Sequence, residues 1–480
     1  MPVARDRTLL SEGIVEERSK SILDRTKAPR PRPAGRISFP KYFKHDYRNG
    51  LRIFVVENHQ LPIVSIGVVL RSGAAYDAGL PGLSSVVCEL VTKGTRKRSA
   101  TQIAEEIDFV GGALSNNVSW DASQVFVSVL KHHLREGFDV LSDVVLNPTF
   151  PEKEIKRVKT QRIAAIRQMK ADPGYLAETA FASVVFGDHP YGSTLSGTEK
   201  SVDKMRRRDL VDFYRRHFTP DNTFIVFAGD ITPGEAQKFV SKYFSKWKGK
   251  SNSEIVAAPK QETGRGRLVI ADKPGAVQSS IRIGHIGITR DNPDFLKVFV
   301  MNTLLGGYFS SRINMNLREV HGYTYGGRTD FDARLLPGAF QVSADVRNEV
   351  TSETIDEVMN ELRRIRDTLP SKDEMTMVKN YLTGLFPIQL ETPQQVAGRV
   401  VAIELYNLPA NYYRNYRENI RKITARDIKT VARKYIRPES AHIVLSGDAN
   451  EIRRKLERLG TVEVLAPNGT DTVKNTNKKS

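Results

Sequence analysis

The sequence is poor in cysteine and has no long apolar run. One cysteine among 480 residues excludes an internal disulfide framework and a Cys-rich zinc module, and it fits a reducing compartment or a cysteine-poor exported protein. No run of about 18 apolar residues occurs, so we expect no membrane span. The first residues, MPVARDRTLLSEGIVEERSK, lack the apolar centre of a secretory signal. This predicts a cytoplasmic chain as written, or a periplasmic one if a leader is missing.

Positive charge is in excess, with 73 Lys+Arg against 55 Asp+Glu and a net charge of +18. An excess of this size favours acidic partners. Nucleic acid is the obvious candidate, but the basic run 205-MRRRD-209 has no interleaved aromatic side chains and fits no nucleic-acid module. We therefore expect solvated basic faces and no specific nucleic-acid binding.

An internal repeat organises the chain. Residues 208-RDLVDFYRRHFTPDNTFIVFAGDITPGEA-236 resemble 426-RDIKTVARKYIRPESAHIVLSGDANEI-452 at a constant offset of 218 residues. Each copy predicts an amphipathic helix, a Pro-containing turn, an alternating strand and a further helix. The helical patterns that open at 150-FPEKEIKRVKTQ-161 and 369-LPSKDEMTMVKN-380 have a similar offset. The repeat therefore predicts two homologous domains.

Within the first copy, strands and helices mix without strict βαβ alternation. Strands are predicted at 51–58 and 63–73, helices at 82–92, 100–110 and 134–145, and a β-hairpin over 112–130. We expect two homologous α+β domains, each an antiparallel-rich sheet with helices packed on one face, which face each other across a cleft. The predicted order is a disordered basic and Pro-rich arm (1–40), a first domain (41–250), a linker (251–266), a second domain (267–465) and a disordered polar tail (466–480).

The nine histidines form no convincing metal motif. A catalytic zinc site needs three protein ligands, and ligands share one face of a helix when they are three or four residues apart. No histidine has a second His or a Glu at that spacing within an H-x-x-E-H or H-E-x-x-H motif. We expect the histidines to be ordinary surface or core residues.

Several motifs together resemble one family. They are RSGAAYD after a strand, G-L-x6-L-x-x-K-G-T from Gly82, GGALSNNVSWD, the strands that end in FAGD and LSGD, and 305-LGGYFSSRINMNLREVHGYTY-325. Over about residues 43–460 the chain resembles the pitrilysin/insulinase family of zinc peptidases, in particular the mitochondrial processing peptidase type. The resemblance implies two domains of this family, the first with a metal-site helix at 82–95.

Active members of that family read G-L-x-H-x-x-E-H in this helix, with a further ligand Glu on a later helix. Alignment on Gly82 places Ser85 at the first His, Cys88 at the base Glu, Glu89 at the second His and Ala165 at the distal Glu. The resemblance therefore implies a degenerate site and no metal or other cofactor in this chain. Residual metal affinity at Cys88 and Glu89 stays open, and a Cys nucleophile would need a basic partner nearby.

A second constellation of the family is intact. Its second half carries an Arg and a Tyr, seven residues apart, which hold the peptide backbone and the tetrahedral intermediate. Arg318 and Tyr325 have this spacing in 318-REVHGYTY-325, and a guanidinium and a phenol donate well to an oxygen that gains negative charge. The alternative is an Arg that caps a helix C-terminus and a Tyr that starts a core strand.

The third feature is 111-GGALSNNVSWDASQVF-126. In relatives the corresponding strand has an open edge to which substrate peptide adds as a further strand. Gly112, Leu114 and Asn116 are the predicted substrate contacts here, since this alternation is compatible with strand addition. An ordinary sheet strand is the equally open alternative.

These features predict a non-catalytic subunit of a two-chain zinc peptidase, inactive alone. Its partner would be a homologue with an intact H-x-x-E-H, which would bring the zinc, and its substrate would be a peptide or unfolded polypeptide. The first alternative is a purely structural protein that shares the fold. An autonomous metallopeptidase with altered metal binding comes next, and a nucleic-acid binder last.

Overall fold

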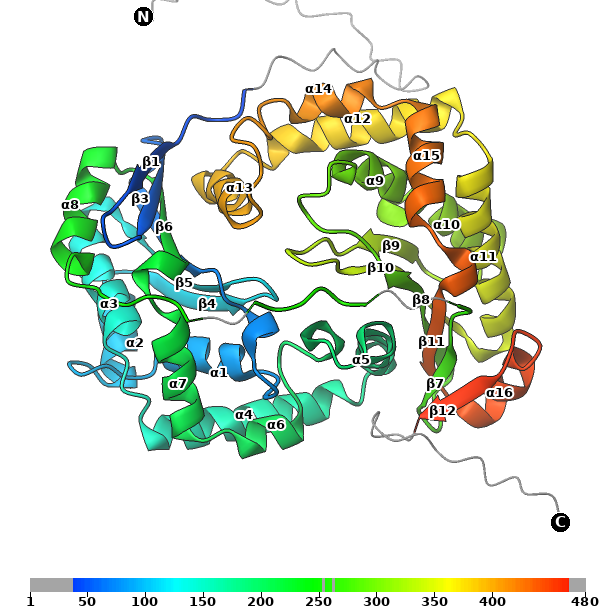
Figure 1. Cartoon of the computed structure of the whole chain (residues 1–480), viewed down its shortest axis with the longest axis horizontal. Helices are drawn as coiled ribbons and strands as arrows, with labels where there is room; N and C mark the ends of the chain where they lie inside the picture. The colour runs from blue at the N-terminus through cyan, green and yellow to red at the C-terminus, as the bar shows by residue number, and fades with distance from the viewer. Residues whose placement is uncertain (1–37, 253–254, 261–263, 466–480) are drawn as a thin grey trace, which may run out of the picture. The chain divides into compact units, whose positions relative to one another are not determined.

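The computed structural model describes residues 38–252, 255–260 and 264–465. Two six-stranded sheets form, one from each copy of the repeat. Figure 1 shows the two sheets with their helices, coloured from blue to green along the first half and from green through yellow to red along the second. The predicted fold class, two homologous α+β units with mostly antiparallel sheets, is confirmed.

The first half contains six strands and eight α-helices. The strands are β1 (Phe43–Asp46), β2 (Arg52–Glu57), β3 (Ile63–Leu70), β4 (Ala113–Val118), β5 (Ser123–Leu130) and β6 (Thr223–Gly229). The helices are α1 (Leu83–Leu90), α2 (Ala100–Phe109), α3 (Leu134–Leu146), α4 (Glu152–Met169), α5 (Pro173–Phe186), α6 (Glu199–Lys204), α7 (Arg207–His217) and α8 (Pro233–Phe244). The elements predicted between residues 51 and 145 are all present, with ends that differ by a few residues.

The second half repeats this order from β2 onward, and its last strand, β12, takes the edge position that β1 has in the first sheet. Its strands are β7 (Leu268–Asp272), β8 (Gln278–Ile286), β9 (Gly327–Phe331), β10 (Ala339–Arg347), β11 (His442–Gly447) and β12 (Val462–Leu465). Its helices are α9 (Phe295–Asn302), α10 (Arg312–Asn314), α11 (Thr351–Asp367), α12 (Lys372–Ile388), α13 (Pro393–Leu405), α14 (Tyr416–Lys422), α15 (Ala425–Tyr435) and α16 (Ala449–Leu456). Two π-helical turns, η5 (Thr303–Gly307) and η6 (Met315–Val320), flank α10. The repeated segments predicted from the sequence are α7-β6-α8 and α15-β11-α16.

The strand orders are β1-β2-β6-β3-β5-β4 and β12-β7-β11-β8-β10-β9. Pairing is antiparallel except for β2 with β6 and for β7 with β11 and β12. The sequence of each strand agrees with its place in the sheet. The central strand β6, TFIVFAG, is buried at every position, as expected where both faces of a sheet are covered. The edge strand β4, ALSNNV, alternates between exposed and half-buried residues.

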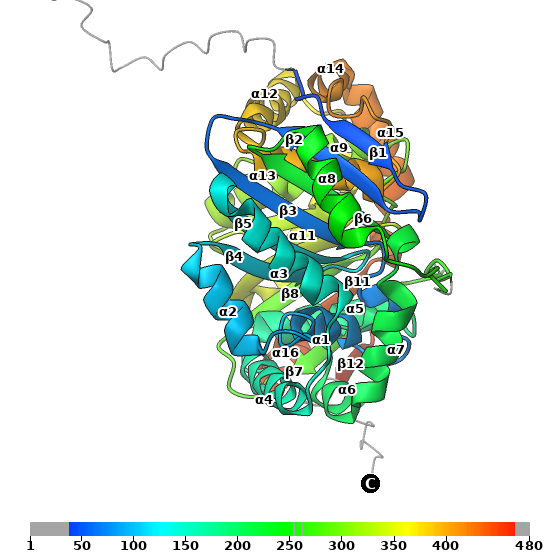
Figure 2. The same cartoon turned by 90° about the vertical axis from the view of Figure 1, so that its left-hand side faces the viewer.

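Each sheet packs its own helices on one face. Figure 2 shows α2, α3 and α8 over the outer face of the first sheet. Several helices of both halves begin at a Ser or Thr whose side chain accepts the backbone N–H of the third helical residue. That third residue is a Gln or Glu, and its side chain accepts the backbone N–H of the Ser or Thr. Such capping boxes occur at Ser99, Thr232, Ser371 and Thr392, and each satisfies two backbone donors that a helix start leaves free.

The opposite face of each sheet is covered by a helix from the other half, which the sequence did not predict. Helix α13 of the second half packs on β2 and β6, and α5 of the first half packs on β8 and β11. Val400 and Ile403 of α13 share one buried cluster with Phe224 of β6. Phe181 of α5 lies in another with Val444 of β11. Burial of these side chains, at about 1.5–3 kcal/mol each, ties the two halves together.

Polar contacts also join the two halves. Glu404 at the end of α13 forms ion pairs with Arg52 and Arg71 of the first half. The carboxylate of Asp121 in the β4–β5 turn accepts the N–H of Leu335 at 3.0 Å. These contacts join loops and helix ends of one half to those of the other.

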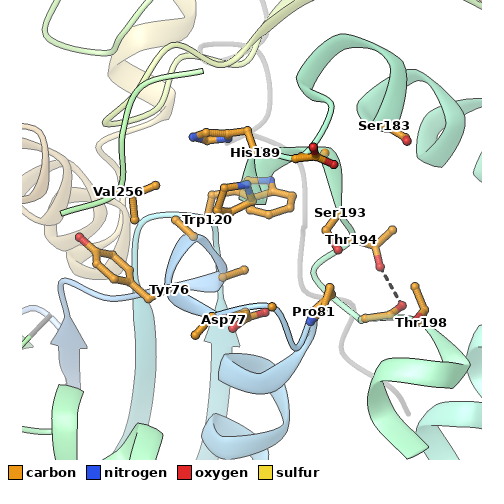
Figure 3. Close-up of a pocket in the computed structure, with 18 of the residues that line it drawn as sticks. Tyr76, Asp77, Pro81, Trp120, Ser183, His189, Ser193, Thr194, Thr198 and Val256 are labelled. Carbon is orange, nitrogen blue, oxygen red and sulfur yellow. Dashed lines mark hydrogen bonds between the residues drawn. The ribbon is translucent and has the colours of Figure 1, made fainter. Parts of the chain in front are cut away.

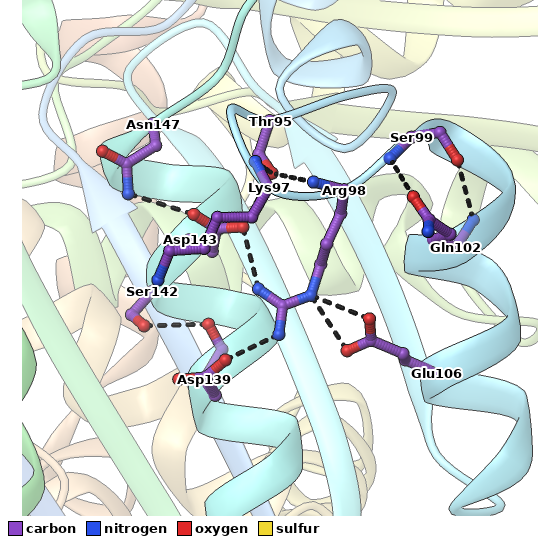
Figure 4. Close-up of polar contacts among 10 residues, drawn as sticks. All are labelled: Thr95, Lys97, Arg98, Ser99, Gln102, Glu106, Asp139, Ser142, Asp143 and Asn147. Carbon is purple, nitrogen blue, oxygen red and sulfur yellow. Dashed lines mark hydrogen bonds and ion pairs between the residues drawn. The ribbon is translucent and has the colours of Figure 1, made fainter.

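The loop after α1 is held by a charged cluster (Figure 4). The Arg98 guanidinium contacts Glu106 at 2.9 Å, Asp139 at 2.6 Å and Asp143 at 2.8 Å. Thr95 donates to Asp143 at 2.7 Å and its hydroxyl accepts the N–H of Arg98 at 2.9 Å. Burial lowers the pKa of Arg98, but the three carboxylate partners outweigh it and raise the pKa above its ordinary value. The Lys-Gly-Thr flank of α1 is therefore part of a structural anchor.

The predicted arm and tail fall almost wholly outside the described residues. Phe39, near the end of the predicted arm, is buried, with its ring centroid 5.5 Å from that of Tyr413. The tail at 466–480 lies outside the described residues. Within the described ranges, no helix combines the length and apolarity needed to cross a membrane.

Candidate functional site

Helix α1 starts at a buried carboxylate. Gly82, at its N-cap, has a φ of 88°, and a Cβ there would lie 2.7 Å from the carbonyl oxygen of Ser196, so glycine is required. Asp77 accepts the N–H groups of Gly82 at 2.7 Å and Ser84 at 2.8 Å. Burial raises the pKa of Asp77 to about 7, against the opposite effect of these hydrogen bonds. The helix that resembles a metal-site helix is therefore fixed at its first turn.

Ser85 and Cys88 both make internal contacts. The Ser85 hydroxyl donates to the carbonyl oxygen of Leu195 at 2.7 Å. Cys88 is 0% exposed, and its Sγ lies 3.4 Å from the carbonyl oxygen of Gln124 in β5. Burial raises the pKa of the Cys88 thiol to about 12. Because the thiolate is the nucleophile and the metal ligand, a protonated, enclosed thiol serves neither purpose.

Glu89 and Ala165 lie at the contact between α1 and α4. Glu89 forms an ion pair with Arg162 of α4, with Nη2 and Oε2 2.6 Å apart. Ala165 follows Arg162 by three residues, which puts both on one face of α4, and Ala165 is exposed. Sequence reasoning missed Arg162. The feature of the sequence that could have identified Arg162 is its position about one helical turn before Ala165.

The side chains at these positions do not fit a zinc site. A hydroxyl engaged with a carbonyl, a protonated thiol and a carboxylate already paired with a guanidinium leave no set of three available ligands. In the part of the chain that the structure describes, no three His, Cys, Asp or Glu side chains gather so as to hold a metal ion. At these positions the side chains of α1 and α4 therefore serve packing and ion pairing.

The predicted substrate strand is an edge strand. Within the described residues, β4 pairs with β5 alone, from Ala113 with Ser128 to Val118 with Ser123. Leu114 and Asn116 are half-buried on one side of the strand. Gly112 precedes the strand, and its N–H donates to the carbonyl of Ile107 at 2.9 Å. Helix α1 packs against this strand, so β4 lies close to the degenerate positions.

Arg318 and Tyr325 lie on an exposed segment of the second half. Arg318 is in the last turn of η6, with its guanidinium carbon 4.8 Å from the ring centroid of Phe309 and its Nε 3.3 Å from a Glu319 oxygen. Tyr325, between η6 and β9, is 92% exposed. Among the described residues its hydroxyl has no hydrogen-bond partner. The Tyr325 side chain is therefore not part of the core, and in the described chain the Arg318 guanidinium donates to no helix-end carbonyl.

The structure does not join these two constellations. In the described ranges, no hydrogen bond, ion pair or ring contact links residues 309–325 with the first half. The degenerate positions and β4 share the first half, whereas Arg318 and Tyr325 belong to the second. Arg318 and Tyr325 therefore make no direct contact with α1 or β4 in the described chain.

A cavity of about 950 Å³ lies beside the start of α1. Figure 3 shows Asp77 and Pro81 at one side of it, with Trp120 and His189 opposite. His189 accepts the N–H of Tyr191 at 3.1 Å and contacts the carbonyl oxygen of Ala257 at 2.9 Å, and burial lowers its pKa. His189 therefore holds the segment that joins the two halves against this wall.

A second cavity, about 340 Å³, lies between the halves. Glu178 and Trp120 of the first half line it together with Asp330, Asp332 and Gln341 of the second. Burial, followed by the charge of Asp332, raises the pKa of Asp330. Sequence reasoning missed both cavities, because residues far apart in the chain form their walls.

Comparisons with known proteins agree with this architecture. Residues 52–199 match the family described as insulinase (peptidase family M16), and residues 204–382 match the peptidase M16 inactive domain. An uncharacterised zinc protease of Bacillus subtilis, YmxG, is 26% identical over 74% of this chain and 86% of its own length. A probable mitochondrial-processing peptidase subunit beta of Arabidopsis thaliana is 24% identical over 85% of this chain and 80% of its own.

Solved structures share the fold. A peptidase M16 inactive domain from Pseudomonas fluorescens aligns with a TM-score of 0.80 and 23% identity, over 85% of this chain and 98% of that one. A protease from Helicobacter pylori aligns with a TM-score of 0.78 and 17% identity, over 85% and 99% of the two chains.

Proposed function

We propose, from the premise that this chain belongs to the M16 family of peptidases, that it is the non-catalytic subunit of a two-chain zinc peptidase. A homologous partner with an intact H-x-x-E-H motif holds the zinc and activates the attacking water. This chain binds no metal or other cofactor. It contributes Arg318 and Tyr325 and part of the surface that encloses the substrate.

The exposure of Tyr325 carries the proposal. A phenol that is 92% exposed contributes little to the packing of this chain. Arg318, in the last turn of η6, rests on Phe309 and offers a charged donor. Donors placed where negative charge develops on a carbonyl oxygen stabilise the transition state of peptide hydrolysis. The two side chains are therefore available to a substrate that a partner presents.

The edge strand β4 supports the binding of an extended peptide. A peptide that adds to this edge would hydrogen-bond to the free backbone groups of the strand, with Leu114 and Asn116 beside its side chains and Gly112 at the entrance. Only an unfolded or short polypeptide can present an extended backbone in this way. The proposed substrate class is therefore peptides and unfolded chains, without specificity for nucleic acid.

A purely structural role is the second candidate, and one observation favours it. Ser85, Cys88 and Glu89 are all engaged within the first half, as in a domain kept for assembly alone. The two candidates differ in what they require of Arg318 and Tyr325. A structural subunit needs neither side chain for activity.

The test is co-expression with an H-x-x-E-H homologue and assay of a purified 1:1 complex on an unstructured peptide. Arg318→Ala or Tyr325→Phe should lower kcat/KM about 10²- to 10³-fold, which corresponds to about 3–4 kcal/mol of transition-state stabilisation for one lost donor. Matched controls are Arg347→Ala and Tyr381→Phe, two partly exposed side chains of the same half.

Three outcomes separate the candidates. Loss of activity in the Arg318 and Tyr325 variants but not in the controls supports the helper subunit. Unchanged activity in all four variants supports the structural role. One tightly bound zinc per molecule of this chain alone, measured by metal analysis, would overturn both.

A further inference from the structure

Asn314 connects the two exposed donors. It ends α10, the short helix between the π-helical turns η5 and η6, and it is 5% exposed. Its Nδ2 donates to the carbonyl oxygen of Phe309 at 2.6 Å, and its Oδ1 accepts the N–H of Gly327 at 3.1 Å. Both ends of the amide are therefore used, and each bond fixes a different piece of backbone.

One of these bonds supports Arg318. Phe309 is 61% exposed, and its ring lies under the Arg318 guanidinium at 4.8 Å. An aromatic ring in this position attracts a cation and limits where the long side chain can point. Because Asn314 holds the backbone of Phe309, it fixes the base on which Arg318 rests.

The other bond supports Tyr325. Gly327 begins β9, two residues after Tyr325. On the other side of Tyr325, the Thr324 hydroxyl donates to the carbonyl of Asp345 in β10 at 2.8 Å. The backbone of Tyr325 is therefore held at both ends, by β10 on one side and by Asn314 on the other. The bond from Asn314 reaches the segment that also carries Arg318, as does the bond from the N–H of Tyr323 to the carbonyl oxygen of Leu317 at 2.8 Å.

Close packing makes this arrangement stiff. A Cβ on Gly327 would lie 2.9 Å from a methyl carbon of Ile313, and one on Gly306 would lie 2.5 Å from the backbone nitrogen of Thr329. Strand β9 thus rests directly on the segment η5-α10-η6. Two π-helical turns in one segment are unusual, and such turns are frequently found at functional sites.

We infer that Asn314 is a positioning residue, which sets Arg318 and Tyr325 in a fixed relation through the backbones of Phe309 and Gly327. The inference rests on the proposed function and adds a residue that touches no substrate. It predicts that loss of Asn314 displaces both donors while their side chains remain intact. Displacements near 1 Å cost up to about 10²-fold in rate in other active sites.

The test uses the 1:1 complex with an H-x-x-E-H homologue. Asn314→Ala should lower kcat about 10- to 100-fold and change KM by less than about threefold. Asn314→Asp can still accept the N–H of Gly327 but cannot donate to Phe309, so its kcat should be intermediate. In an Arg318→Ala background, Asn314→Ala should lower kcat by a smaller factor than in the wild-type background, because only the displacement of Tyr325 still has an effect there.

The matched control is Asn348→Ala. Asn348 is a buried asparagine of the same half, 2% exposed, and it donates to Ala276 and to Glu451 at 2.7 Å. Its loss should lower the thermal stability as much as the loss of Asn314, without changing kcat per folded molecule. If Asn314→Ala and Asn348→Ala lower kcat equally, the inference is wrong. If Arg318→Ala itself has no effect, the proposed function fails first.

Hydrogen exchange on the chain alone provides a second measurement that needs no partner. Peptides that cover residues 321–330 should exchange faster in Asn314→Ala than in the wild type, because Gly327 loses its acceptor and the Tyr325 segment is released. Asn348→Ala should leave these peptides unchanged. Equal exchange in the two variants would overturn the inference even if the complex cannot be prepared.

Discussion

The single cysteine provides a direct measure of how closed the degenerate site is. The Cys88 side chain is 0% exposed, and burial raises its pKa from an ordinary value of 9.0 to about 12. At about pH 8 this leaves roughly one thiol in 10⁴ ionised, against roughly one in ten for an ordinary thiol. Because only the thiolate attacks an alkylating reagent, ionisation alone slows the reaction about 10³-fold.

The perturbation is alkylation of the folded chain with iodoacetamide, followed by mass spectrometry. In concentrated guanidinium chloride, one equivalent should react at the rate of a free thiol. In native buffer the rate should be at least about 10³-fold lower, since closed packing adds to the low thiolate fraction. Cys88→Ser serves as the blank. Fast, stoichiometric labelling of the folded chain would refute the reasoning and reopen the interpretation of Cys88 as a nucleophile.

Two further predictions concern stability. Arg98→Ala should lower the free energy of unfolding, measured in urea, by about 3–5 kcal/mol, because the buried carboxylate of Asp143 (4% exposed) would lose its charged partner. Arg167→Ala is the control: it removes an exposed ion pair and should lower the free energy of unfolding by less than about 1 kcal/mol. Burial lowers the pKa of His285 to about 4 from 6.5, so its contribution is complete above pH 6.5 and is lost as the pH falls towards 4, by about 2 kcal/mol at pH 5. His285→Gln should flatten this slope, whereas an unchanged slope would show that other groups cause it.

Burial is the main cause of the acid sensitivity expected of His285, and the charges of Arg437 and His442 add to it. Its Nδ1 lies 2.9 Å from the carbonyl oxygen of Ile286, and its Nε2 accepts the N–H of Arg437 at 3.1 Å. A neutral ring with its proton on Nδ1 satisfies both contacts. Protonation of Nε2 would place a second donor against the N–H of Arg437, in a site that solvent does not reach.

Local patterns predicted the first half well. The hairpin expected over 112–130 is β4 and β5, because alternation of polar and apolar residues is a property of the strand itself. The helix expected at 82–92 is α1, because its apolar residues recur with the helical period, which is likewise a property of the segment itself. The second half follows from the repeat, since α7 and α15, or β6 and β11, have matching sequences. These predictions needed no knowledge of long-range contacts.

The sequence could not show which elements meet. Helix α5, PGYLAETAFASVVF, is apolar on most of its surface because it lies between its own half and the sheet of the other. Such a helix has no single apolar stripe, so its period does not reveal its neighbours. The ion pair between Glu89 and Arg162 joins residues far apart in the chain. The π-helical turns around Asn314 break a helical pattern without a proline to signal it.

The residues on α1 and the pair Arg318 and Tyr325 differ in how far their polar side chains are bonded within this chain. If the ligand positions on α1 had been lost without compensation, a cavity or an unpaired charge would remain there. Instead Ser85 donates to Leu195, Cys88 fills space against β5, and Glu89 is neutralised by Arg162. Helix α1 is therefore stable without a metal.

Tyr325 shows the opposite condition. It is exposed, has no hydrogen-bond partner within the described residues, and yet its backbone is tied on both sides by Thr324 and Asn314. A tyrosine in a mobile surface loop would need no such ties, and a tyrosine kept for packing would be buried. A polar side chain on a fixed backbone, with its hydroxyl unused, is the arrangement expected of a group that awaits an acceptor from another molecule. The contribution to catalysis that we propose for this chain therefore rests on its second half.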